Sequence, residues 1–234
     1  MTDTPAPYGT PDHPRVAVRG EARLEVDPET AHITITVTAR GKDRRTTLED
    51  LTRRNAHVLE LARTYGQAVE KLETGALSIT PELTQRGRDE KIRAYHGRVH
   101  ITAELADFTA LGELTTRIAD LDMTRITGPR WALRPDSPAY TEARRQAVRE
   151  ALQRAREYAD ALGTHLTALL ELADLGAENT ALAPPVPAPP GGFGARAAYG
   201  GTEPETPPVL DLEPQRQTVY AQVNARFTMA PPKL

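Results

Sequence analysis

The sequence predicts an α+β fold in which an antiparallel or mixed sheet carries helices packed on one face. Several segments alternate apolar and polar residues, which is typical of strands with one buried and one exposed face. Two tandem ββα units each contain two such segments followed by a helical segment. A third, longer helical segment carries a row of alanines and precedes two further strands.

We expect one domain over residues 15–230, preceded by a disordered tail over residues 1–14. Residues 176–216 are rich in proline and glycine and are predicted to form a long loop insertion. The segment 217–229 after this insertion alternates cleanly, and a lone amphipathic strand cannot bury its apolar face by itself. We therefore expect the last strand to rejoin the same sheet.

The first unit begins with strands at Val16–Val26 and Ala31–Ala39, which we expect to form a hairpin around a turn at residues 27–30. A helix is predicted over Asp43–Tyr65. Asn55 lies in the middle of its apolar face, where a buried amide needs partners, so we expect it to bond nearby backbone or a loop. The apolar residues of that face are Leu48, Leu51, Val58, Leu59 and Ala62.

The second unit begins with a strand around Leu77–Leu83. Proline cannot donate to a strand ladder, so Pro81 either confines this strand to the edge of a sheet or ends it early. A long strand over Tyr95–Leu105 follows. Asp107 then caps a second helix, and a strand over Met123–Leu133 completes the region. The buried face of this helix is predicted to contain Phe108, Leu111, Leu114, Ile118 and Leu121.

A long amphipathic helix is predicted from Ser137 to Gly163. Asp136 or Ser137 can cap it, and Pro138 suits its first turn. Its apolar face is predicted to contain Tyr140, Ala143, Ala147, Val148, Ala151, Leu152, Ala155, Tyr158, Ala159 and Leu162. The alanines allow close backbone approach, so we expect the helix to lie tightly on a sheet, with a contact between subunits as the alternative. A strand over Leu166–Leu175 follows.

Composition excludes several classes of function. The formal net charge is -3, with 29 basic and 32 acidic residues, so the general electrostatic signature of a nucleic-acid-binding protein is absent. The chain has no cysteine, which excludes disulfides and thiol catalysis. The first residues have neither a basic n-region nor an apolar h-region, and no apolar run reaches membrane-spanning length. We expect a cytoplasmic protein with no membrane span.

The search for catalytic or cofactor motifs gives no candidate, so we predict no catalytic residue, no cofactor and no metal. His96 and His100 share a strand face but lie about 13 Å apart along it, too far to bind one zinc ion together. A three-histidine site that includes His32 is the alternative to solvated histidines. Trp131 is expected to pack in the sheet or at an interface.

One predicted surface is unusual because basic and aromatic residues outnumber acids on the outward face of the strands. This candidate contact face comprises Arg19, Arg23, His32, Arg98, His100, Tyr220, Asn224 and Arg226. We expect it to bind an anionic partner or a neighbouring subunit, and plain solvent exposure is the alternative.

Several short motifs in order resemble those of the SIMPL-domain family, a bacterial group that includes periplasmic and outer-membrane immunogenic proteins. They are Val18-Arg19-Gly20-Glu21, Asp27-Pro28, Asn55, Thr74, Leu77-Ser78-Ile79-Thr80-Pro81, Tyr95, Asp107, Leu111-Gly112, Gly128, Ala147, Ala151, Arg154-Ala155, Tyr158-Ala159, Leu162-Gly163 and Thr218–Thr228. The resemblance implies an α+β fold, ring-like or channel-like homo-oligomers, a link to oxidative-stress tolerance, and no established catalytic residues.

These observations together predict a non-enzymatic, self-associating interaction or scaffold protein. The alternative is a small-molecule-binding protein or unrecognised enzyme with a pocket between sheet and helices, near Asn55 or under the proline-rich loop. A homo-oligomer is the expected partner, and nucleic acid is not expected.

Overall fold

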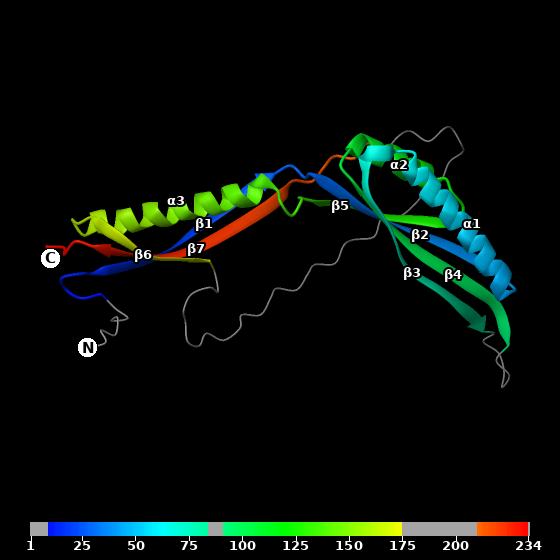
Figure 1. Ribbon diagram of the computed structural model, residues 1–234, viewed down its shortest axis with the longest axis horizontal. Helices are drawn as coiled ribbons and strands as arrows, with labels where there is room; N and C mark the ends of the chain where they lie inside the picture. Colours follow the sequence, from blue (N-terminus) through cyan, green and yellow to red (C-terminus); the bar gives the residue numbers. More distant parts are fainter. Residues whose placement is uncertain (1–8, 84–90, 175–209, 234) are drawn as a thin grey trace, which may run out of the picture. The chain divides into compact units, whose positions relative to one another are not determined.

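The computed structural model describes residues 9–83, 91–174 and 210–233. Their contacts divide them into two compact units, each with its own sheet and its own apolar core. The first unit contains residues 9–26, 136–174 and 218–233. The second contains residues 27–83, 91–135 and 210–217. The α+β class is confirmed, with antiparallel sheets that carry their helices on one face (Figure 1). Residues 1–8 of the predicted tail lie outside the described residues, as does most of the loop insertion, whereas Thr10 and His13 of the tail form an isolated β-bridge.

The first unit is a three-stranded sheet of order β1-β7-β6 covered by one helix. It consists of β1 (Arg15–Val26), α3 (Pro138–Ala161), β6 (Leu166–Asp174) and β7 (Gln217–Met229). Strand β7 pairs antiparallel with β6, so the last segment of the chain does return to a sheet, as its alternation predicts. The helix lies along β1 and β7 (Figure 1).

The row of alanines on α3 makes this close packing possible. Ala143, Ala147, Ala151, Ala155 and Ala159 are all buried, and Ser137 caps the helix, as the sequence predicts. On the facing strand, a methyl group added to Gly20 would lie 2.0 Å from the carbonyl oxygen of Ala147. Helix and strand backbones are therefore nearly in contact. The larger residues Val148, Tyr158 and Leu162 are exposed, which corrects their predicted place on the buried face. A surface that admits only small side chains directs bulky ones to the flanks of the helix.

The second unit is a four-stranded sheet of order β3-β4-β2-β5. Its strands are β2 (Thr30–Gly41), β3 (Val69–Leu83), β4 (Ile92–Leu105) and β5 (Thr124–Ala132). Its helices are α1 (Arg44–Arg63) and α2 (Phe108–Ala119), with a short 3-10 helix, η1, at Gly66–Ala68. Asp43 and Asp107 cap α1 and α2 by accepting backbone N–H bonds, and β3 is an edge strand. The Asp107 cap and the edge position of β3 were predicted, whereas Asp43 was predicted only as the first residue of its helix.

The core of the second unit lies between this sheet and its two helices. Ile33, Ile35 and Val37 of β2 are no more than 1% exposed and face the helices. Trp131 packs edge-on against Phe108, with ring centroids 4.8 Å apart, which confirms its packing role. Leu48 is 41% exposed and does not belong to the buried face of α1. Asn55 also departs from expectation, because its Oδ1 is buried without a hydrogen-bond partner among the described residues.

Two predictions about strand pairing are wrong. The expected single sheet is replaced by two, and β1 and β2 do not form a hairpin. Strand β1 neighbours β7, whereas β2 pairs with β4 and β5. Alternation identifies the buried face of a strand, but it does not identify the neighbouring strand. The assignment of residues 15–230 to one domain stays a prediction.

Candidate functional site

The candidate contact face is divided between the two sheets. Arg19, Arg23, Tyr220, Asn224 and Arg226 lie on β1 and β7 of the first unit. His32, Arg98 and His100 lie on β2 and β4 of the second unit. The eight residues therefore form two separate surfaces, each on a sheet face away from its helices. Any role of either surface in contact with a partner stays a prediction.

On the first sheet the cations of this face have local partners. Arg19 Nε donates to Asn224 Oδ1 over 3.3 Å. Arg23 bonds Glu25 at 3.0 Å and lies over the Tyr220 ring at 5.7 Å. Arg226 bonds Glu171 of β6 at 2.8 Å. Exposed pairs of this kind contribute little to stability, but they reduce the net charge that this face offers to a partner.

On the second sheet the centre of the exposed face carries basic residues, and its arginines, Arg98 and Arg125, make no ion pair among the described residues. Arg98 and His100 lie opposite Thr38 and Thr36 of β2, and Arg125 of β5 lies opposite Thr36 on the other side. These side chains border a hollow of about 460 Å³, lined by Thr36, Thr38, Arg98, His100, Met123, Thr124, Arg125 and Thr127. The Thr36 hydroxyl lies 3.1 Å from His100 Nδ1 and helps to orient the ring.

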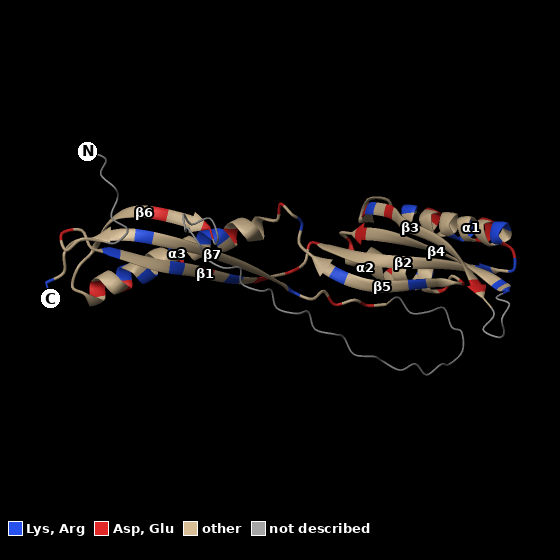
Figure 2. Cartoon of the chain, turned by 90° about the horizontal axis from the view of Figure 1, so that it is seen from below, with Lys and Arg blue, Asp and Glu red and all other residues tan. Residues whose placement is uncertain are grey.

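The sequence prediction omitted Arg125, which completes this basic hollow. The sequence could have indicated Arg125, because Arg125 and Thr127 alternate with the half-buried Ile126. This alternation places both polar residues on the outward face of β5. Blue bands mark the basic residues of β5 in Figure 2.

At one end of the same face, Glu82 contacts two arginines and a histidine. Its carboxylate lies 2.7 Å from Arg40, 2.7 Å from His96 and 3.8 Å from Arg93. Hydrogen bonds from Arg40, and then from His96, lower the pKa of Glu82 from 4.5 to about 2. The carboxylate therefore stays ionised in the folded protein at a pH where the unfolded chain binds a proton.

This shifted pKa predicts how stability depends on pH. A lowered carboxyl pKa stabilises the fold above pH 4.5, and that contribution is lost as the pH falls from 4.5 toward 2. Wild type should therefore be more stable than Glu82→Gln at pH 6, and the difference should shrink between pH 4.5 and 2. Urea unfolding of both proteins across this range measures it. A difference that stays constant with pH would contradict the prediction.

The two outer edges of the first sheet differ in whether side chains of the same unit bond to their backbone. At the edge strand β1, the Glu21 N–H donates to Glu150 of α3 at 3.0 Å. Arg154 of α3 donates to the Arg19 carbonyl at 2.8 Å and also bonds Glu150. Side chains of α3 thus form hydrogen bonds with backbone groups at the β1 edge, and these bonds hinder the addition of another strand there.

The opposite edge strand, β6, lacks such protection among the described residues. No described strand pairs with its outer edge. Leu169, Leu170 and Leu172 are 54%, 45% and 47% exposed. Leu169 and Leu172 pair with Phe227 and Ala225, both buried, so they point to the helix side, but α3 leaves them largely uncovered. An apolar strand with an open edge is a ready template for pairing with another chain.

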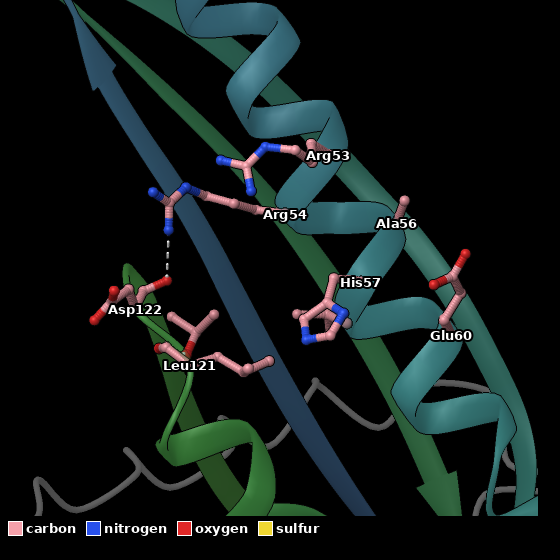
Figure 3. Close-up of a pocket in the computed structure, with 9 residues that line it drawn as sticks. Arg53, Arg54, Ala56, His57, Glu60, Leu121 and Asp122 are labelled. Atoms are coloured by element: carbon pink, nitrogen blue, oxygen red, sulfur yellow. Dashed lines mark hydrogen bonds between the residues drawn. The ribbon is translucent and has the colours of Figure 1, made fainter.

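A third feature is a pocket of about 480 Å³ between α1 and the segment that joins α2 to β5 (Figure 3). Arg53, Arg54 and His57 line it, but both arginines bond Asp50, and Arg54 also donates to the Asp122 carbonyl at 3.0 Å. The bond from Arg54 to Asp122 joins α1 to the α2–β5 segment, whereas the bonds to Asp50 stay within α1, so these contacts explain the arginines as structural residues. Asn55 does not line this pocket.

The three-histidine site, which was the alternative to solvated histidines, is not assembled. His96 bonds Glu82, His100 lies beside Thr36, and His32 lies 3.9 Å from Glu104. In the described parts of the chain, no three side chains of the His, Asp and Glu types are grouped as metal ligands. None of the described helices is both long and apolar enough to span a membrane.

Comparison with known proteins places the chain in a family. The profile of SIMPL, described as a protein of unknown function (DUF541), matches residues 16–227. The 26 kDa periplasmic immunogenic proteins of Brucella melitensis and Brucella abortus are each 25% identical over 182 residues, which cover 75% of this chain and 70% of theirs.

A crystal structure of a putative amidohydrolase/peptidase from Burkholderia cenocepacia shares 19% identity, covering 57% of this chain and 33% of that one. Its TM-score is 0.23, too low for any conclusion about this protein. The family profile, by contrast, extends from β1 to β7 and so includes both units. The chain therefore belongs to the SIMPL family.

Proposed function

We propose that this protein is a non-enzymatic interaction module that self-associates through the outer edge of β6. The observation that carries the proposal is the open edge itself, which exposes Leu169, Leu170 and Leu172. A second copy of the chain is the occupant that these features favour. Since side chains of α3 already bond backbone groups at the β1 edge, we expect association through this sheet to use the β6 edge.

The sequence of β6 is compatible with pairing to its own copy. An antiparallel pair centred on Leu170 would place Glu171 opposite Leu169 and Asp174 opposite Leu166. Carboxylates would then lie opposite apolar residues rather than opposite each other, which avoids direct like-charge repulsion across the pair. The two sheets would join into one of six strands and cover the exposed leucines.

A lysine in the middle of this edge tests the proposal. Leu170→Lys is expected to reduce the mass measured by light scattering from a multiple of the chain mass to that of a single chain. A lysine at an edge both repels its copy and resists burial. The matched control is Leu77→Lys, which alters a leucine of similar exposure, 57%, on the edge strand β3 of the other sheet.

Two results would overturn the proposal. One is a wild-type protein that remains a single chain throughout the micromolar concentration range. The other is an oligomer whose mass does not respond to Leu170→Lys, or responds equally to Leu77→Lys. Circular dichroism of each variant confirms that a change in mass does not come from unfolding.

A cytoplasmic location and a role in stress tolerance are further parts of this proposal. The role in stress tolerance rests on the family resemblance. Cell fractionation tests the location, and growth of a strain lacking the protein under peroxide tests the role. Small-molecule binding, the alternative function, was predicted for a pocket between sheet and helices. The exposed face of the four-stranded sheet offers a different place for such binding, which is compatible with self-association through β6.

A further inference from the structure

The exposed face of the four-stranded sheet has an uneven distribution of charge. Among the described residues, its acidic side chains lie away from the centre and have arginine, lysine or histidine neighbours. Glu82 bonds Arg40 and His96, Glu73 bonds Lys71 at 2.9 Å, and Glu104 lies 3.9 Å from His32. Because these acidic side chains contact their neighbours, they contribute little negative potential at the central hollow.

The hollow in the centre of the face contains basic groups and hydroxyls, and none of its lining residues is acidic. Arg98 and Arg125 make no ion pair with any residue in the described parts of the chain. They lie on β4 and β5, on either side of the central strand β2. Neighbouring strands are about 4.8 Å apart, and the two arginines are also offset by two residues along β2, where they lie opposite Thr38 and Thr36. Their backbones are therefore about 12 Å apart, a separation that two long arginine side chains can span to reach one ligand.

Polar groups between the two arginines can complete a binding site. The Thr36 hydroxyl and the His100 ring lie beside each other in the floor of the hollow. Thr127 adds a hydroxyl on the β5 side. The Thr38 hydroxyl donates a hydrogen bond to the Met123 carbonyl over 2.9 Å, and this bond links β2 to the residue that precedes β5. Strand backbones rather than loops therefore hold the donors in place.

We propose that this hollow binds the phosphoryl group of a small molecule. Two guanidinium groups, an imidazole and hydroxyls suit a tetrahedral dianion, because arginine can donate two parallel bonds to phosphate oxygens. A volume of about 460 Å³ exceeds the needs of free phosphate and leaves space for the rest of a metabolite-sized ligand. This site lies in the other unit from β6, so it does not depend on self-association.

Calorimetric titration tests the proposal with three probes at matched ionic strength: inorganic phosphate, adenosine monophosphate and adenosine. Phosphate and the monophosphate are expected to bind, and adenosine is not. Tighter binding of the monophosphate supports a phosphorylated small molecule as ligand, whereas equal binding supports the phosphoryl group alone as the determinant. Binding should weaken as sodium chloride is added, because salt screens an exposed charged site.

The double variant Arg98→Gln/Arg125→Gln is expected to weaken binding of phosphate and of the monophosphate by about tenfold or more, because each arginine donates charge-assisted bonds. The control is Arg23→Gln, which removes a guanidinium from the other sheet, where it is paired with Glu25. Melting temperatures identify any variant that has lost its fold. No binding of either phosphate probe by wild type, equal binding by wild type and the double variant, or binding of adenosine would overturn the proposal.

Discussion

Replacing Gly20 with alanine is expected to lower the free energy of unfolding by about 1–3 kcal/mol, and replacing it with valine by more. The added Cβ would lie 2.0 Å from the Ala147 carbonyl oxygen and 2.6 Å from the Ala151 nitrogen. Both atoms belong to the backbone of α3, which cannot rotate aside as the end of a flexible side chain could. The helix must therefore move away from β1 and lose close packing along its alanine row. Urea unfolding followed by far-ultraviolet circular dichroism measures the loss.

Gly75→Ala provides the matched control for this prediction. Gly75 lies on the exposed strand β3, where an added Cβ would meet only the His100 carbonyl oxygen, at 3.7 Å, an ordinary contact distance. We expect a change within about 0.5 kcal/mol. Equal stability of Gly20→Ala and wild type would show that α3 does not approach β1 as closely as described.

The same variant tests the prediction of one domain. The single tryptophan, Trp131, lies in the second unit, whereas Gly20 lies in the first. If residues 15–230 unfold as one domain, Gly20→Ala lowers the midpoint of the Trp131 fluorescence transition together with the midpoint measured by circular dichroism. A fluorescence midpoint that stays at its wild-type value would show that the two units unfold independently.

Truncating Leu114 to alanine is expected to lower the free energy of unfolding by about 2–5 kcal/mol. Leu114 is fully buried on α2, between Leu111 and Ile118 of the same helix face, in the core between this helix and the sheet. Its loss removes apolar contacts and leaves a space that the surrounding residues fill only in part. Trp131 fluorescence during urea unfolding reports this change directly, because Trp131 packs against the same core.

The control for Leu114→Ala is Leu77→Ala. Leu77 is 57% exposed on the edge strand β3, so its truncation is expected to change stability by less than about 0.5 kcal/mol. Similar losses in the two variants would show that Leu114 does not lie in a close-packed core.

Features that depend on neighbouring residues in the sequence were predictable. Alternation identified Ile33, Ile35 and Val37 as buried, because successive side chains of a strand point to opposite faces. The caps Asp43 and Asp107 were predictable because their side chains bond backbone N–H groups only two or three residues away. The alanine row was predictable because a four-residue spacing keeps residues on one side of a helix.

Features that depend on distant partners were not predictable in this way. The expected hairpin between β1 and β2 was wrong because the two strands select partners about 200 and about 70 residues away. The contact face was predicted as one surface for the same reason, since it combined strands that belong to different sheets. The exposure of Leu48 depends on which side of α1 the sheet covers, and that is not encoded in the periodicity of the helix alone.

The sequence by itself determined the class of the fold, the family, the buried side of most strands and the limits of the helices. All of these follow from local periodicity, local hydrogen bonding or short motifs. Only the tertiary structure decided that there are two sheets, that α3 occupies the β1 edge, and that β6 keeps its leucines exposed. It also brought Arg98, His100 and Arg125 together around β2. The physical reason is that strand pairing joins backbone groups, which are the same in every residue except proline, so partners are selected by packing of the whole chain.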